Sequence, residues 1–248
     1  MNTYISSVPV WVSALFLLTF PLAVVLIANA VRNAARNAGF EAKRVRMAVL
    51  TVYGFYTAFL LFTSVLTLTG VFAENMLPPR PLLFAAFPYA FLLIGVASRS
   101  SWFGSLMEHA HVEDLVKVHI FRFVGIFFLI GTYYEVLPVR FALVAGLGDI
   151  ITALGALVVA KAVQERKEWS FAALLIWNVF GTVDILTVVG SALVETRYAI
   201  ANGTQGVAGI AQFPFSWIPA FAPVTILFLH FYVFVKLKAY KQSLVKTA

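Results

Sequence analysis

Long apolar runs separated by short polar segments dominate the pattern of this chain. Seven runs are long enough, at about 20 residues each, to cross a hydrocarbon core of about 30 Å. We expect them at residues 9–31, 46–73, 81–98, 118–136, 141–162, 169–193 and 217–236. Because the linkers between them are short, the pattern predicts an all-α, polytopic membrane protein whose seven transmembrane helices form a single helix-bundle domain, residues 1–248.

Basic residues are distributed unevenly among the linkers. Most of them fall in the first, third and fifth linkers and in the tail: Arg32, Arg36, Lys43, Arg44, Arg46, Arg99, Lys117, Lys161, Arg166, Lys167, Lys236, Lys238, Lys241 and Lys246. The alternate linkers hold only Arg80, Arg140 and Arg197. The positive-inside rule therefore predicts an external N-terminus and a cytoplasmic C-terminus, which agrees with an odd number of spans.

Two features modify the spans. Pro21 lies inside the first run and is expected to kink that helix, which should end near Asn29. Residues 194–216, between the sixth and seventh runs, are expected to form an external loop.

Composition supports the membrane assignment. Of the 248 residues, 61% are hydrophobic and 12% are charged, whereas soluble domains contain about 25% charged residues. The chain has no cysteine, which excludes disulfides, iron–sulfur clusters and cysteine-ligated zinc. The formal net charge of +7 follows from topology and favours anionic lipid headgroups as partners rather than nucleic acid.

The linker before the fourth run has a mixed character. Trp102, Phe103 and Leu106 recur at helical spacing, which predicts a short interfacial helix lying in the membrane plane. His109 and His111 follow, and together with Glu108, Glu113 and Asp114 they could bind a divalent metal. The alternative is a solvated polar face, because histidines two residues apart point to different sides of a helix.

Ionisable and polar residues inside the last four runs are the main functional lead. A charge at membrane depth costs about 2.5–3.5 kcal/mol on insertion scales, so it normally faces a bundle interior and marks a functional site. The residues that we assign to a substrate or proton pathway are Arg122, Asp149, Asn178, Asp184, His230, Trp177 and Tyr133. Counted from the helix ends, they form a ladder of depths, with Arg122 near the cytoplasmic edge and Tyr133 near the outer surface.

Each of these residues also has a purely structural interpretation. Arg122 could extend its side chain to the inner headgroups, and Asp149 could be a protonated carboxyl group bonded to a neighbouring helix. His230 could be a core histidine whose hydrogen bonds are all satisfied.

Spacing indicates which helix faces are buried. His119, Arg122 and Gly125 follow at three-residue steps, and Trp177, Gly181 and Asp184 share one stripe. Small residues surround Asp149: Ala145, Gly146, Gly148, Thr152, Gly155 and Ala156. Small residues let helix backbones approach closely, so we expect these faces to pack against other helices.

Four fragments resemble a group of uncharacterised bacterial seven-helix membrane proteins. They are F-R-x-x-G at Phe121–Gly125, G-D-I at Gly148–Ile150, W-N-x-x-G at Trp177–Gly181, and F-P-F-S-W-I-P-A-F…L-H at Phe213–His230. The resemblance covers residues 118–230, and it implies a fold and a bacterial inner-membrane location without an activity. His119 departs from the group's pattern, in which glutamine is common.

Three functional hypotheses follow. The first is a protein that binds or transports a small molecule or ion with proton coupling. The second is a redox protein with a b-type haem held by His119 and His230. The third is a membrane enzyme acting on a lipid-like substrate through the acidic residues and histidines of 108–114. A retinal protein is disfavoured, because Lys236 and Lys238 lie at the end of the last run rather than in its middle.

Overall fold

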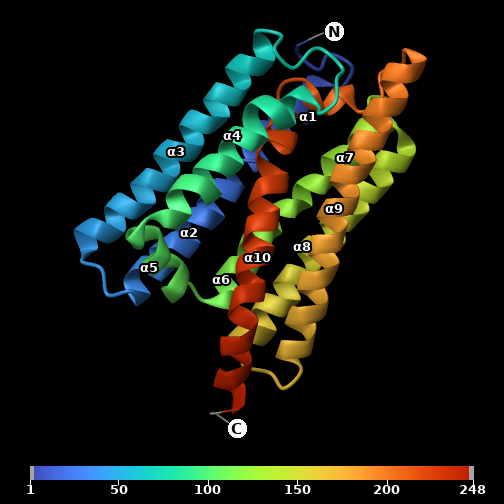
Figure 1. Cartoon of the computed structure of the whole chain (residues 1–248). Helices are drawn as coiled ribbons and strands as arrows, with labels where there is room; N and C mark the ends of the chain where they lie inside the picture. The colour runs from blue at the N-terminus through green and yellow to red at the C-terminus, as the bar shows by residue number, and fades with distance from the viewer. Residues whose placement is uncertain (1–2, 246–248) are drawn as a thin grey trace.

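The computed structural model describes residues 3–245, and these form the predicted all-helical bundle (Figure 1). Seven helical segments are long and apolar enough to cross a membrane. Their bounds are Val10–Asn37, Ala42–Leu68, Leu82–Arg99, Val112–Tyr133, Val139–Gln164, Ser170–Asn202 and Trp217–Val245. The number of spans predicted from the sequence is therefore confirmed, and the protein is an integral membrane protein. Lys246, counted above in the basic tail, lies outside the described residues.

The first span is interrupted at its proline, as predicted. It consists of α1 (Val10–Thr19) and α2 (Leu22–Asn37), with Phe20 and Pro21 between them. Proline has no N–H to donate and its ring crowds the preceding turn, so the helix is broken there. The expected end near Asn29 is wrong, because an alanine-rich segment continues the helix to Asn37.

Other helix ends also lie beyond the apolar runs. The fourth span begins at Val112 rather than at 118, and the sixth continues to Asn202, so part of the expected external loop is helical. A polar turn at either end of a helix continues its backbone hydrogen bonds without entering the hydrocarbon, and hydrophobicity alone does not detect it. The second span is α3 (Ala42–Leu68), the fifth is α8 (Val139–Gln164), the sixth is α9 (Ser170–Asn202) and the seventh is α10 (Trp217–Val245).

The third span is the most irregular. It combines the π-helical segments η1 (Leu82–Ala86) and η2 (Phe91–Val96) with α4 (Phe87–Ala90) between them, and ends in the 3₁₀ turn η3 (Ala97–Arg99). Pro88 within α4 lacks an N–H, so the i→i−4 ladder cannot run unbroken through this span. Such π segments are rare in helices and often occur at functional sites.

Two short helices connect the third span to the fourth. The predicted interfacial helix is α5 (Ser101–His109), which is preceded by Ser100, whose side chain accepts a hydrogen bond from the N–H of Phe103 at 3.1 Å. The fourth span then consists of α6 (Val112–Val118), the 3₁₀ segment η4 (His119–Gly125) and α7 (Ile126–Tyr133). A further 3₁₀ turn, η5 (Ala208–Ala211), precedes α10.

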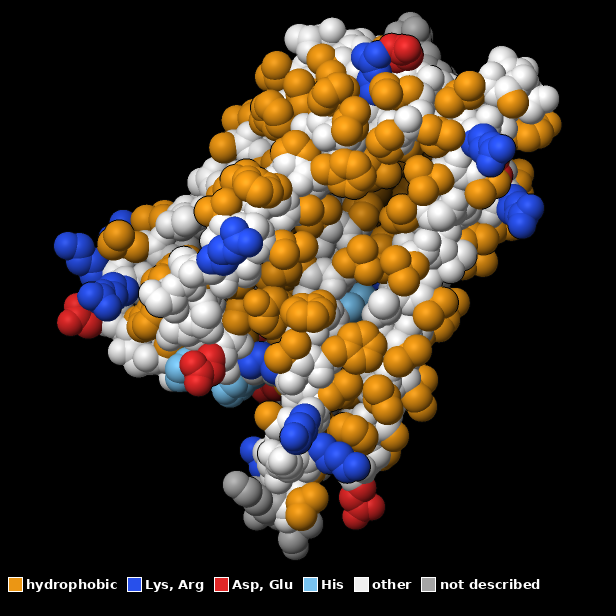
Figure 2. All heavy atoms as spheres, in the orientation of Figure 1, with side chains coloured by type: hydrophobic (Ala, Val, Ile, Leu, Met, Phe, Trp, Pro, Cys, Tyr) orange, Lys and Arg blue, Asp and Glu red, His pale blue; other side chains and the backbone are white. Residues whose placement is uncertain are grey.

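The helices form two groups with α10 between them (Figure 1). The segments α2, α3 and α4 lie on one side, and α7, α8 and α9 lie on the other. One hydrophobic core cluster contains residues of all seven spans. On the surface, hydrophobic side chains cover the middle of the molecule, and most Lys and Arg side chains lie toward its ends (Figure 2).

Candidate functional site

His119, Arg122 and Gly125 of the fourth span lie in a single column along the helix. His119, Arg122 and Gly125 all lie in η4, a 3₁₀ segment of seven residues. A 3₁₀ helix has three residues per turn, so side chains three apart are eclipsed, whereas in an α-helix they would drift around the axis. The three-residue spacing in the sequence thus becomes a straight column that faces the neighbouring helices. A 3₁₀ run of this length inside a span is uncommon and is typical of a hinge or a strained segment.

Arg122 is the centre of a buried ion cluster. Its side chain has no solvent exposure, and its Nε donates to Asp149 Oδ1 of α8 at 2.6 Å. Its Nη2 donates to Asp184 Oδ2 of α9, and its Nη1 lies 3.4 Å from the carbonyl oxygen of Gly181. One guanidinium therefore joins three spans. The interpretation that Arg122 extends its side chain to the inner headgroups is wrong, since the guanidinium pairs with two carboxylates in the interior.

Glycines allow the three spans to approach closely enough for these contacts. A Cβ atom on Gly125 would lie 2.5 Å from Asp149 Cβ, and one on Gly148 would collide with the carboxylate of Asp184. A Cβ on Gly181 would lie 2.5 Å from Cε1 of His230. These distances are shorter than any ordinary contact, so a side chain at one of these positions would displace Asp149, Asp184 or His230.

A second group of polar residues borders the ion cluster at Gly181. The rings of His119 and His230 lie with their centroids 4.2 Å apart, and Trp177 contacts both, at 5.0 and 5.2 Å. The indole N–H of Trp177 donates to the carbonyl oxygen of Thr152 at 2.9 Å, which fixes its ring against α8. All three rings are buried.

Asn178 determines the tautomer of His230. Its amide nitrogen donates to the backbone carbonyl of His230 at 3.1 Å, a group that can only accept. The amide oxygen therefore faces Nδ1 of His230 at 2.7 Å, and Nδ1 must carry the hydrogen. In the neutral ring, Nε2 then has a free lone pair.

Three ring nitrogens in this group have no hydrogen-bond partner among the described residues. They are Nε2 of His230 and both Nδ1 and Nε2 of His119. Buried polar atoms are normally paired with protein, ordered water or a ligand. The protein groups described here therefore satisfy only Nδ1 of His230. With both rings neutral, the pair offers one free lone pair on each ring and one N–H of His119.

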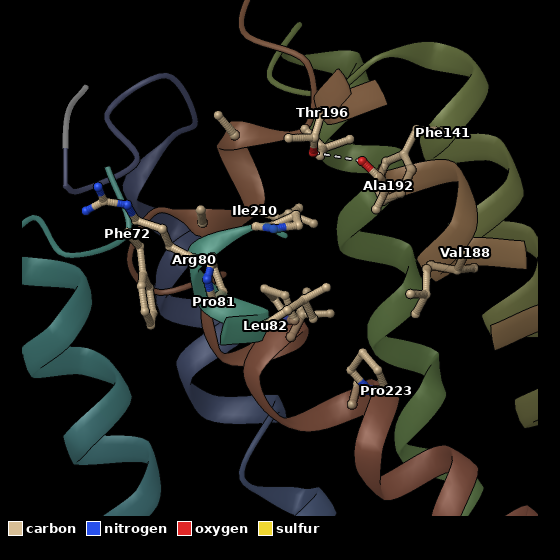
Figure 3. Close-up of a pocket in the computed structure, with 18 of the residues that line it drawn as sticks. Phe72, Arg80, Pro81, Leu82, Phe141, Val188, Ala192, Thr196, Ile210 and Pro223 are labelled. Carbon is tan, nitrogen blue, oxygen red and sulfur yellow. Dashed lines mark hydrogen bonds between the residues drawn. The ribbon is translucent and has the colours of Figure 1, made fainter. Parts of the chain in front are cut away.

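A cavity of about 70 Å³ borders the ion cluster, since Asp149 is among its lining residues. Figure 3 shows other parts of its wall. Pro223 of α10 and Val188 and Thr196 of α9 also line it. Arg80, from the linker before the third span, lies on the opposite side of the cavity from α9 in Figure 3. The linkers at this end are those that the distribution of basic residues predicts to be external. The sequence does not reveal this cavity, because the apolar residues of its wall have the same pattern as residues of an ordinary helix core.

Most of the pathway residues predicted from the sequence come together, with one exception and one change of depth. Arg122, Asp149, Trp177, Asn178, Asp184 and His230 form the two adjoining groups described above. Tyr133 is 79% exposed and packs on Tyr134, away from them. The predicted ladder of separate depths is also wrong, because Arg122 contacts both carboxylates. With the fourth span starting at Val112, Arg122 lies about 15 Å along it rather than at its edge.

The histidines at 109 and 111 lie apart from this site. His109 Nδ1 contacts the carbonyl oxygen of Ser105 at 2.9 Å, and His111 Nδ1 contacts Glu113 Oε1 at 3.2 Å. Asp114 accepts a hydrogen bond from Asn33 at 3.1 Å. Within residues 3–245, no group of three or more His, Asp or Glu side chains is placed to hold a metal ion.

A haem does not fit between His119 and His230 in this arrangement. The iron and its macrocycle would have to lie between the two rings, and the rings are in contact, with centroids 4.2 Å apart. Nδ1 of His230 is moreover bound to Asn178, and Trp177 closes the other side of the pair. We derive no redox chemistry from these residues.

Comparison with known proteins places the chain in a family. No curated protein and no solved structure matches it. A family model described as a domain of unknown function, DUF8737, matches residues 79–238, which include the third to sixth spans, most of the seventh and every residue of the two polar groups. Because the match covers more than half of the 248 residues, the chain belongs to the DUF8737 family.

Proposed function

We propose that this protein is a membrane carrier that binds a small molecule or ion at the Arg122–Asp149–Asp184 cluster and couples its movement to one proton. The observation that carries the proposal is the charge of the cluster. One guanidinium faces two carboxylates, so the fully ionised cluster has a net charge of −1 in the interior of a membrane protein. An uncompensated charge is costly there, and binding a proton or a monovalent cation would neutralise it.

The cavity supports a binding role for the cluster. Asp149 lines it together with residues of the linkers that are predicted to be external, so a ligand that enters from that end of the bundle can contact its carboxyl group. Its wall is apolar apart from a few groups such as Arg80 and Thr196. A small polar ligand therefore meets its main polar partners at the cluster, which is how small-molecule sites in proteins fix orientation.

The histidine group supplies a second place for a proton. Nε2 of His230 bears a free lone pair, and Gly181 separates it from Arg122 by a single backbone unit. His230 can therefore hold a proton beside the cluster without belonging to it. The long 3₁₀ segment η4 and Pro223 in α10 are positions at which the two spans could bend, as the broken helices of transporters do.

Transport is tested by current measurements on proteoliposomes attached to a solid support. Concentration jumps would use a panel of monovalent cations, small amines and small carboxylates, each at equal and at unequal pH across the membrane. We expect a transient current for at least one class, increased by an inward proton gradient. Asp149→Asn should abolish it, because the neutral cluster no longer needs a proton.

Asp114→Asn is the matched control. Of the three aspartates of the chain, Asp114 is the one outside the cluster, and it bonds to Asn33. Its variant should keep the wild-type current. Equal currents from wild type and Asp149→Asn for every member of the panel, or no current from either, would refute proton-coupled transport.

A further inference from the structure

A second cavity lies along α10, lined there by Thr225, Phe228 and Leu229. Its volume is about 260 Å³, and it is bounded by α2, α3, the third span, α5, α6 and α10. None of the side chains that line it is charged. An engineered cavity of about 150 Å³ in another protein suffices to bind benzene, so this one has room for a ring and part of a hydrocarbon chain.

Four of the residues that line this cavity carry a hydroxyl group, and three of these groups, all but that of Thr51, bond to one another. The hydroxyl oxygens of Tyr56 and Tyr89 lie 2.9 Å apart, and Tyr89 Oη lies 2.8 Å from Oγ1 of Thr225. All three residues are buried and come from three different spans. Hydroxyl groups in spans usually bond to the backbone of their own helix, so the sequence does not predict that these three bond to one another.

A count of protons shows that this chain of hydroxyls is incomplete. Three hydroxyl groups carry three hydrogens, and the two contacts between them use two. The remaining hydrogen has no acceptor among the described residues. An unpaired buried donor costs about 1–3 kcal/mol, so the cavity offers one hydrogen-bond donor to any occupant with an accepting oxygen.

The wall of the cavity reaches the lipid-facing surface. Phe55, Leu92 and Trp102 line it and are 37%, 44% and 40% exposed. These residues lie on the outer faces of the second and third spans and of α5, where acyl chains surround an integral membrane protein. A hydrophobic molecule can therefore reach the cavity from the bilayer without crossing water.

We propose that this cavity binds a neutral, lipid-soluble molecule that carries a carbonyl or ether oxygen on a hydrocarbon skeleton. The absence of charged lining excludes a carboxylate or phosphate head inside the cavity. A plain acyl chain of a phospholipid would fill the volume but leave the spare hydroxyl hydrogen unpaired. The oxygen of the proposed ligand satisfies it. The site shares no residue with the ion cluster, so it does not depend on the carrier function.

Two probes of the same shape test the proposal. One is a benzoquinone with a short prenyl tail, and the other is a benzene ring with the same tail and no oxygen. Equilibrium binding of radiolabelled probes to the full chain in detergent should show the quinone bound about tenfold more tightly, which corresponds to one hydrogen bond of about 1.4 kcal/mol.

The triple variant Tyr56→Phe/Tyr89→Phe/Thr225→Val separates the hydroxyl contribution from shape. It keeps both rings and the shape of the Thr225 side chain, and it removes all three hydroxyl groups of the chain. The preference for the quinone should vanish, while binding of the hydrocarbon probe should stay unchanged. Tyr198→Phe, at an exposed tyrosine outside the cavity, should behave as wild type.

Ala34→Leu tests whether both probes occupy the cavity. Ala34 lines it and is buried, so the larger side chain should abolish binding of both. Gel filtration and circular dichroism verify that each variant is folded. Equal affinity of the wild type for the two probes, no binding of either, or an undiminished preference in the triple variant would overturn the proposal.

Discussion

The two halves of the molecule bury polar groups of different cost, and they are packed accordingly. Spans one to three contribute hydroxyl groups such as those of Tyr56 and Tyr89, whereas spans four to seven contribute Arg122 and two aspartates. In the apolar window of the third span 17% of the residues are buried, against 61% in that of the fourth. A hydroxyl group tolerates a loose environment because its desolvation is modest, but a charge requires partners at close range.

The space around the glycines differs between the two halves in the same way. Gly125, Gly148 and Gly181 have no room for a Cβ, because other spans approach them directly at the ion cluster. By contrast, a Cβ on Gly54 in the second span would have no neighbouring atom within 4 Å. Close approach in the C-terminal half is therefore a requirement of the buried charges, and the comparison can be broken by experiment.

Removing the central cation should have the largest effect. Arg122→Gln leaves two carboxylates buried without their partner, and breaking a buried ion pair on one side costs about 3–5 kcal/mol. We expect a loss of that size in the free energy of unfolding, measured by SDS titration in mixed micelles. Arg140→Gln, at an exposed arginine, should change it little. A stable Arg122→Gln variant would show that the carboxylates are not held ionised by Arg122.

Neutralising Asp149 should lower the free energy of unfolding in the same assay by less than removing Arg122 does. Asp149→Asn leaves Arg122 paired with Asp184, so the cluster becomes neutral and keeps one ion pair. We expect a smaller loss of unfolding free energy than for Arg122→Gln. A larger loss for Asp149→Asn would contradict the net negative charge on which the proposed proton binding depends.

Glycine substitutions on one helix should separate close packing from helix propensity. Gly181→Ala forces a methyl group against the ring of His230, and overpacking of this kind costs about 1–3 kcal/mol. Gly190→Ala lies farther along α9 with nothing within 4 Å, and should be neutral or slightly stabilising. Thermal unfolding followed by circular dichroism measures both. Equal effects would mean that α9 is free to shift at Gly181.

The smallest effect is expected in the N-terminal half. Tyr56→Phe removes one hydroxyl and one hydrogen bond to Tyr89, which is worth about 0.5–1.5 kcal/mol. The loss in thermal stability should therefore lie well below that of Arg122→Gln. A loss as large as that of Arg122→Gln would mean that the hydroxyl chain, and not only the ion cluster, holds the two halves together.

The sequence alone determined the number of spans, the break at Pro21 and most members of the polar site. Apolar runs of membrane length, a proline inside one of them and charged residues inside others are local signals that need no partner to be read. The fragments around Arg122, Asp149, Asn178 and His230 each contributed a residue to the two polar groups. Helix ends were less predictable, because polar end turns such as those before residue 118 and after residue 193 carry no hydrophobic signal.

Only the tertiary structure decided how these residues meet. The 3₁₀ form of η4 aligns His119 with Arg122, and the direction of each side chain determines that Arg122 reaches two carboxylates and that Tyr133 faces outward. The link between Tyr56 and Thr225 through Tyr89 likewise joins spans that are far apart in the chain. Contacts of this kind depend on relative rotation and distance between helices, which packing of all seven spans fixes together and no local pattern encodes.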